Sequence, residues 1–324
     1  MSNCFSPANI LLPNDGIDMK KWSVIACDQF TSQADYWDAV EKYVGDAPST
    51  LNVVFPEIYL GTIAKHENDC NSSGGGVKND KETGRKTKYA SMTDDERIKY
   101  INTSMETYLT DGTLKQAVAD GYVLVERTTE SGVRLGIVGL IDLDDYDFDP
   151  KKKTLIRATE GTVISRIPPR VKIRENAAIE LPHVMLLVDD PIDRQKIDGC
   201  QGATQEDAVN ITAVKHGIIE YVYAIRDTLR KLYDTDLMQG GGHIRGYAVE
   251  GEAAMQVTEA FAAKQNSCGG FLFAVGDGNH SLATAKTCWE NIKKSGKFTE
   301  EQLKTHPARH ALVEICNLHS EALE

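Results

Sequence analysis

The chain has 324 residues, of which 41% are hydrophobic and 26% are charged, a composition typical of globular proteins. Its net charge of −12 repels phosphodiester backbones, which argues against nucleic acid as a partner. No stretch approaches the roughly 20 apolar residues that a membrane span needs, and residues 1–16 lack the pattern of a signal peptide. The seven cysteines form no CxxC pair, which favours reduced thiols in a cytosol. We therefore expect a cytoplasmic protein that does not associate with a membrane. The sequence is also compatible with a homo-oligomer.

The first half of the chain predicts short strands and helices around one polar loop. The apolar run at 22–27 has strand character, and the helical spacing of apolar residues in 28–44 predicts a helix. Residues 65–88 are glycine-rich and almost without apolar side chains, so we expect a mobile loop there. A second helix, capped by Thr93, should run to about residue 111 and continue or restart through 114–121. Two apolar runs then flank the turn 129–132 and predict a hairpin.

The second half alternates strand and helix patterns. A helix should begin at Pro169 and run to residue 181, and 183–190 reads as a buried strand. Residues 208–233 predict a long amphipathic helix, or a strand followed by one. The order then becomes a glycine loop at 240–242, a strand at 243–250, a helix at 252–265, a strand at 271–276 and a helix at 280–294.

This order predicts an α/β to α+β fold with mixed sheets and flanking helices. We expect an N-terminal α/β domain at 1–150 and a C-terminal one at 151–324. The C-terminal domain should be truncated, because HALVEICNLH (310–319) reads as the beginning of an element close to the last residue.

The strongest candidate site is the turn Asp277-Gly278-Asn279-His280 between a predicted strand and helix. Gly278 permits a tight turn, and a helix start presents unpaired N–H groups and a positive dipole end, a combination that binds phosphate or carboxylate. Asp277 adds an acid, base or metal ligand, Asn279 an amide, His280 an imidazole and Ser281 a hydroxyl. The alternative is that Asn279 or Ser281 caps the helix and His280 lies on the surface.

The turn GDGNHSLATAK (276–286) resembles the DGHHR-type turn of the domain-of-unknown-function 1015 family, an uncharacterised family. The segments at 27–37, 157–191 and 232–247 are similar to the same family, so the resemblance covers nearly the whole chain. Members usually extend past this endpoint, which also suggests truncation.

The turn is in addition similar to the phosphate-binding turn of the ParB and sulfiredoxin superfamily, which includes an ADP-dependent free serine kinase. That similarity implies a ParB/sulfiredoxin-like element around the DGNH turn. Here Asn279 replaces the first histidine and Ser281 replaces the phosphate-gripping arginine. Anion binding would therefore fall to backbone amides and His280.

Basic residues gather between 157 and 174 in this acidic chain. If Pro169 starts a helix, Arg170 and Arg174 share one face, and arginine matches phosphate bidentately. The alternative is pairing with local carboxylates. The family resemblance favours a functional role for four residues of this segment, namely Arg157, Glu160, Arg166 and Arg170.

Three further residues are weaker candidates. Gly241 permits close approach of a ligand to the backbone, and His243 follows it, but a P-loop needs the opposite order of elements and a GK[ST] ending. His183, His243 and His280 are suitable ligand types for a metal, although no spacing such as HExxH connects them. We assign no residue as a metal ligand.

The first hypothesis is an enzyme that binds a phosphorylated small molecule or nucleotide, such as a phosphotransferase. Amides at 278–281 and the arginines of 157–174 would neutralise the phosphate, with Asp277 or Glu160 handling a proton or Mg²⁺. The second is a non-catalytic sensor of an anionic ligand, and the third is a metal-dependent hydrolase that uses His183, His243 and His280. The sequence identifies no substrate. The one cofactor that it suggests is Mg²⁺ together with a nucleotide.

Overall fold

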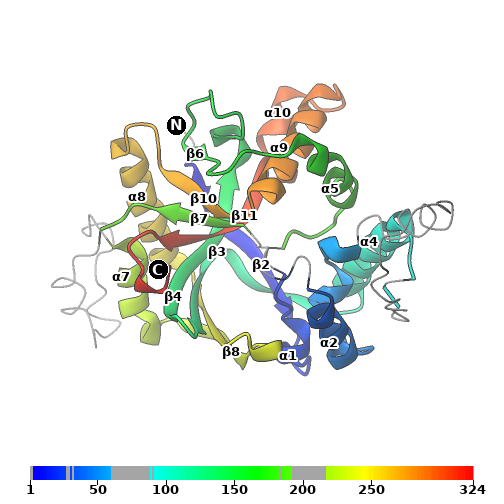
Figure 1. Ribbon diagram of the computed structural model, residues 1–324. Helices are drawn as coiled ribbons and strands as arrows, with labels where there is room; N and C mark the ends of the chain where they lie inside the picture. Colours follow the sequence, from blue (N-terminus) through cyan, green and yellow to red (C-terminus); the bar gives the residue numbers. More distant parts are fainter. Residues whose placement is uncertain are drawn as a thin grey trace, which may run out of the picture.

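A computed structural model describes residues 3–26, 30, 33–59, 88–89, 91–181, 184–191 and 217–323 (Figure 1). The helices are Met19–Trp22 (α1), Ala34–Val44 (α2), Asp94–Thr110 (α4), Ile167–Arg174 (α5), Ile218–Ala224 (α7), Gly251–Ser267 (α8), Asn279–Lys294 (α9) and Glu300–Lys304 (α10). The strands are Phe5–Ser6 (β1), Ala8–Pro13 (β2), Leu114–Thr129 (β3), Gly132–Asp142 (β4), Tyr146–Asp147 (β5), Ile156–Arg157 (β6), Met185–Val188 (β7), Arg230–Asp236 (β8), His243–Val249 (β9), Phe273–Asp277 (β10) and His310–Asn317 (β11). Short 3₁₀ turns connect several of them.

The strands form one mixed sheet, in the order β5-β6-β10-β7-β11-β4-β3-β9-β8, with β1 beside β4 and β2 beside β3. Strand β10 is parallel to β6 and antiparallel to β7, whereas β11 is parallel to β7 and antiparallel to β4. Helices flank this sheet, which confirms the predicted α/β to α+β class.

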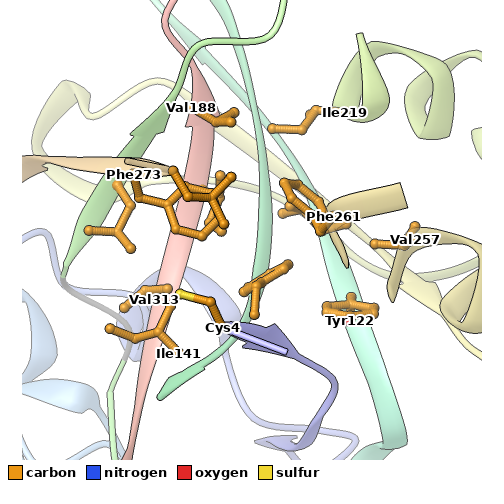
Figure 2. Close-up of a cluster of buried hydrophobic side chains, with 14 of the residues drawn as sticks. Cys4, Tyr122, Ile141, Val188, Ile219, Val257, Phe261, Phe273 and Val313 are labelled. Atoms are coloured by element: carbon orange, nitrogen blue, oxygen red, sulfur yellow. The ribbon is translucent and has the colours of Figure 1, made fainter. Parts of the chain in front are cut away.

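Alternation along the strands sorts side chains onto two faces of the sheet. One face carries Leu124, Ile137 and Ile315, which pack beneath α7 and α8 in the main core. Figure 2 shows part of this core, where Phe261 of α8 lies near Phe273 of β10 with ring centroids 6.0 Å apart. Burying an aromatic side chain of this kind contributes about 1.5–3 kcal/mol to stability.

The other face carries Val123, Val125, Val138 and Ala248, which pack against β2 and the first half of β3. Helices α1, α2 and α4 lie on this side of the molecule, in smaller apolar clusters of their own (Figure 1). Of the polar residues discussed below, Glu314 and Arg134 belong to this second face.

Several predicted elements are confirmed by the structure. Helix α2 covers residues 34–44 of the predicted 28–44 stretch, and α4 begins at Asp94 after a capping box formed by Thr93 and Glu96. Strands β3 and β4 form the predicted hairpin around 129–132, where Gly132 has a φ of 128° that favours glycine. The predicted order of β9, α8, β10 and α9 is also correct.

Four local predictions were wrong. Residues 114–119 belong to strand β3, not to a helix, because they pair with β2. Trp22 ends helix α1 and residues 23–26 are irregular, so no strand lies there. Helix α5 ends at Arg174, and the described part of 208–233 is helix α7 followed by strand β8. The predicted mobile loop 65–88 lies outside the described residues except for Lys88.

The predicted boundary at residue 150 falls between two paired strands. Strands β5 and β6 lie on its two sides and pair in parallel. Strands β3 and β4 precede the boundary, and their partners β9 and β11 follow it. The two-domain division therefore stays a prediction, for which a fragment experiment is given below.

Candidate functional site

The predicted turn lies where β10 leaves the sheet and α9 begins. The pairing of β10 with β7 shifts register between Val275 and Asp277, so that Asp277 rather than Gly276 stands opposite Met185. Gly278 then adopts a left-handed conformation, with φ 85° and ψ 28°, which a residue with a Cβ rarely adopts. The sequence thus builds a strand, a bulge and a left-handed turn that redirects the chain into α9.

The start of α9 has free backbone donors. No side chain caps it, and its first backbone hydrogen bond runs from the Leu282 N–H to the Gly278 carbonyl at 2.9 Å. The amides of Asn279, His280 and Ser281 find no acceptor among the residues that the structure describes. The preceding amide, Gly278 N–H, donates to Asp277 Oδ1 at 2.7 Å. Three N–H groups and the positive end of a 16-residue helix therefore point away from the helix.

Asn279 and His280 attach a distant segment to this turn. Asn279 is 5% exposed; its Oδ1 accepts the Thr159 N–H at 3.2 Å, and its Nδ2 donates to Thr159 Oγ1 at 3.3 Å. His280 Nε2 accepts the Val163 N–H at 3.3 Å, so the neutral ring carries its proton on Nδ1. Both side chains thus hold the 159–163 backbone against the start of α9.

The segment 157–174 therefore meets the turn, but its guanidinium groups have other partners. Arg157 donates to the carbonyls of Thr154 and Gly270 at 3.1 and 3.2 Å, near the opposite end of β10. Arg170 pairs with Glu57 at 2.8 Å. Arg174 pairs with Glu180, one of the local carboxylates considered from the sequence.

Two other candidates of this segment are solvent-exposed. The Arg166 side chain lies on the surface, and its carbonyl accepts a hydrogen bond from Arg170 Nη1 at 3.0 Å. Glu160 is likewise exposed, one residue after Thr159. The structure thus brings the backbone of this segment to the turn, while the guanidiniums of Arg157, Arg170 and Arg174 contact groups outside the turn.

Gly241 and His243 lie elsewhere in the sheet. Four strands separate β9 from β10, about 24 Å at the usual strand spacing. A Cβ on Gly241 would lie 2.2 Å from Ile25 Cδ1, so this glycine serves packing. His243 contacts Asp236 through Nδ1 at 2.7 Å and Asp234 through Nε2 at 2.6 Å. His183 lies outside the described residues.

Sequence reasoning missed an ion pair in the central strands. Arg134 of β4 and Glu314 of β11 join at 3.0 Å between Nη2 and Oε2. Burial lowers the pKa of the Arg134 guanidinium. The Glu314 carboxylate raises this pKa, Cys316 and Asp277 raise it further, and the result lies above the ordinary value. The available signal was a charged residue between apolar neighbours in each of the two segments, at VRLGIV and LVEIC.

Two searches of the described residues gave negative results. They contain no group of three or more His, Cys, Asp or Glu side chains that could hold a metal ion. They also contain no helix with the length and apolar character needed to cross a membrane.

The chain belongs to the family described as "Protein of unknown function (DUF1015)", whose model matches residues 82–230 and 227–324. The DGNH turn, α5 and the Arg134–Glu314 pair all lie inside these matched ranges. No curated protein and no solved structure matches the chain. The similarity to ParB and sulfiredoxin stays a prediction.

Proposed function

We propose that the β10–α9 turn binds the phosphate group of a small molecule or nucleotide, and that the protein is an enzyme acting on this ligand. The observation that carries the proposal is the uncapped start of α9, with the amides of Asn279, His280 and Ser281 unpaired among the described residues. Backbone N–H groups at a helix start bind phosphate because they combine several donors with a positive dipole end.

The side chains of the turn would have different roles. Asn279 and His280 hold the 159–163 backbone beside the turn, so they position the site and would not exchange protons in the reaction. Asp277 is the carboxylate beside the unpaired amides, and it would either coordinate Mg²⁺ or accept a proton from an acceptor hydroxyl. This division supports a phosphotransferase in preference to a histidine-based mechanism.

The alternatives have less support. A sensor would use the same turn without turnover, and no described contact favours it. A hydrolase that uses His183, His243 and His280 needs these rings together. His243 is instead held between two aspartates, and four strands lie between its strand and the one that precedes His280.

Ser281→Asp tests the proposal without disturbing the helix. A carboxylate in the first turn of α9 should stabilise the helix by about 0.3–1 kcal/mol, yet repel a phosphate at the same amides. We expect the melting temperature to hold or rise, and phosphate or ADP affinity measured by calorimetry to fall at least roughly tenfold.

The matched control is Ser91→Asp, which makes the same change just before α4. It should leave ligand affinity unchanged. Equal phosphate affinity in the wild type and Ser281→Asp would refute binding at the turn. Asp277→Asn should keep ligand affinity while turnover, once a substrate is found, is lost; an unaffected rate would remove Asp277 from the mechanism.

A further inference from the structure

The segment that follows β6 leaves the sheet at the same edge as the DGNH turn. Strands β6 and β10 pair in parallel, with Ile156 opposite Phe273 and Arg157 opposite Ala274. The carboxyl ends of parallel strands lie at one edge of a sheet, and open α/β sheets bind their ligands outside that edge. Residues 158–163 therefore emerge beside the start of α9.

Three hydrogen bonds fix this segment against the turn. Thr159 Oγ1 donates to the carbonyl of Val275, the last residue before the register shift of β10, at 2.6 Å. Asn279 Oδ1 accepts the Thr159 N–H at 3.2 Å, and His280 Nε2 accepts the Val163 N–H at 3.3 Å. These bonds place Val163 next to the first turn of α9. Helix α5, which follows the segment, packs on α9 as well (Figure 1).

Val163 and Ile164 expose apolar side chains that the fold does not use. They are 46% and 63% exposed, and Ile164 is the most exposed large hydrophobic residue in the described part of the chain. Neither belongs to an apolar cluster of the described residues, whereas Ile167 in the first turn of α5 is buried. Isolated exposed apolar residues are common on protein surfaces. Two consecutive β-branched ones, held beside unpaired backbone amides, instead indicate a surface that contacts a ligand.

We infer that Val163 and Ile164 contact the organic part of the ligand whose phosphate binds the amides of α9, and that the ligand is a phosphate monoester with an apolar or aromatic group close to its phosphate. Such a group would gain affinity by covering the two side chains, because apolar surface is removed from water on both partners. Inorganic phosphate has no group that could make this contact. The inference rests on the proposed function, and it gives the 157–174 segment a role through its apolar residues.

The test compares inorganic phosphate with phenyl phosphate, with affinities measured by calorimetry and the melting temperature followed in parallel. The wild type should bind phenyl phosphate at least roughly tenfold more tightly than inorganic phosphate. Val163→Ser/Ile164→Ser should remove this preference and leave the phosphate affinity unchanged, because the Val163 N–H that binds His280 is retained. The melting temperature should stay close to that of the wild type, since both side chains are exposed.

The matched control is Val133→Ser/Leu318→Ser, which removes two apolar side chains of similar exposure, 45% and 53%, on β4 and directly after β11. It should bind both probes as the wild type does.

The outcomes separate the inference from the proposed function. Loss of the phenyl phosphate preference in the Val163/Ile164 variant, with the preference kept in the control, supports the inference. A wild type without the preference, or a variant that keeps it, overturns the inference, while phosphate binding that Ser281→Asp abolishes would leave the proposed turn site standing. An equal loss of both probes in the variant also counts against the inference, because it would show an effect on the turn itself. Wild-type affinity of Ser281→Asp for both probes overturns the turn site and the inference with it.

Discussion

His243 lies between two carboxylates, and this arrangement makes its contribution to stability depend on pH. Hydrogen bonds to Asp236 and Asp234 raise the pKa of His243 above its ordinary 6.5, while Arg245 opposes the rise. Hydrogen bonds from Lys231 and His243 lower the pKa of Asp234, and the hydrogen bond with His243 lowers that of Asp236. The imidazolium therefore has ionised partners through the weakly acidic range.

A raised folded-state pKa means that the stabilisation by His243 is complete below the unfolded pKa and disappears as the pH rises through the folded one. We expect His243→Gln to lower the melting temperature most at about pH 5.5, with the difference shrinking above neutrality. Thermal unfolding between pH 5 and 9 measures this. An equal loss at both ends would show that the ring contributes by packing and not by charge.

The turn residues and the distant ion pairs differ in how readily they can be predicted from the sequence. Asp277 and Gly278 were predictable because strand, turn and helix follow one another in a contiguous stretch. Arg134 and Glu314 lie 180 positions apart and meet only through the pairing of β11 with β4. The partner of Arg170 was equally hidden, because Glu57 comes from the N-terminal helical region. Local pattern thus indicates the donors of a helix start, but not which distant charges pair with each other.

At the scale of elements, self-contained signals were the reliable ones. Helix α4 carries its own capping box, and the predicted start at Thr93 is confirmed. Residues 114–119 have apolar spacing that a helix could also use, yet they pair with β2 in a long strand. Hydrogen bonds to a segment about 100 positions earlier decided that conformation, and periodicity contains no information about them.

The connection between α9 and the 159–163 segment leads to a prediction for Asn279. Its buried amide makes two hydrogen bonds to Thr159, at 3.2 and 3.3 Å. Asn279→Ala should lower the free energy of unfolding by about 1–3 kcal/mol, because two hydrogen bonds are lost and each contributes about 0.5–1.5 kcal/mol. It should also expose the 159–166 stretch to proteolysis. Urea unfolding and limited proteolysis measure these effects.

Asn291→Ala is the matched control, since Asn291 is an exposed residue of the same helix. Its unfolding free energy should stay within about 0.5 kcal/mol of the wild type. An Asn279→Ala protein as stable and as protease-resistant as this control would show that the segment is held by other contacts, such as the packing of α5 on α9.

At the scale of the whole molecule, one sheet joins parts of the chain that precede and follow residue 150. Strand β3 lies between β4 and β9, and β4 lies between β3 and β11. The ion pair of the central strands follows the same pattern: Arg134 precedes residue 150, whereas Glu314 follows it. This ion pair therefore needs both halves of the chain in register.

This leads to a prediction for the fragments 1–150 and 151–324. Alone, the first would leave the β3–β4 hairpin with an apolar face and two unpaired edges, because β9 and β11 belong to the second. The second would lose the two strands between β11 and β9, so its sheet would be interrupted at the centre. We expect each fragment to aggregate or to lack a cooperative thermal transition when expressed alone, and the two to form a soluble complex when coexpressed.

Calorimetry and size-exclusion chromatography would show this, with the intact chain as reference. Two separate, cooperative transitions from the isolated fragments would instead establish two domains that meet at residue 150, and would mean that the central pairing of β4 with β11 is a domain interface.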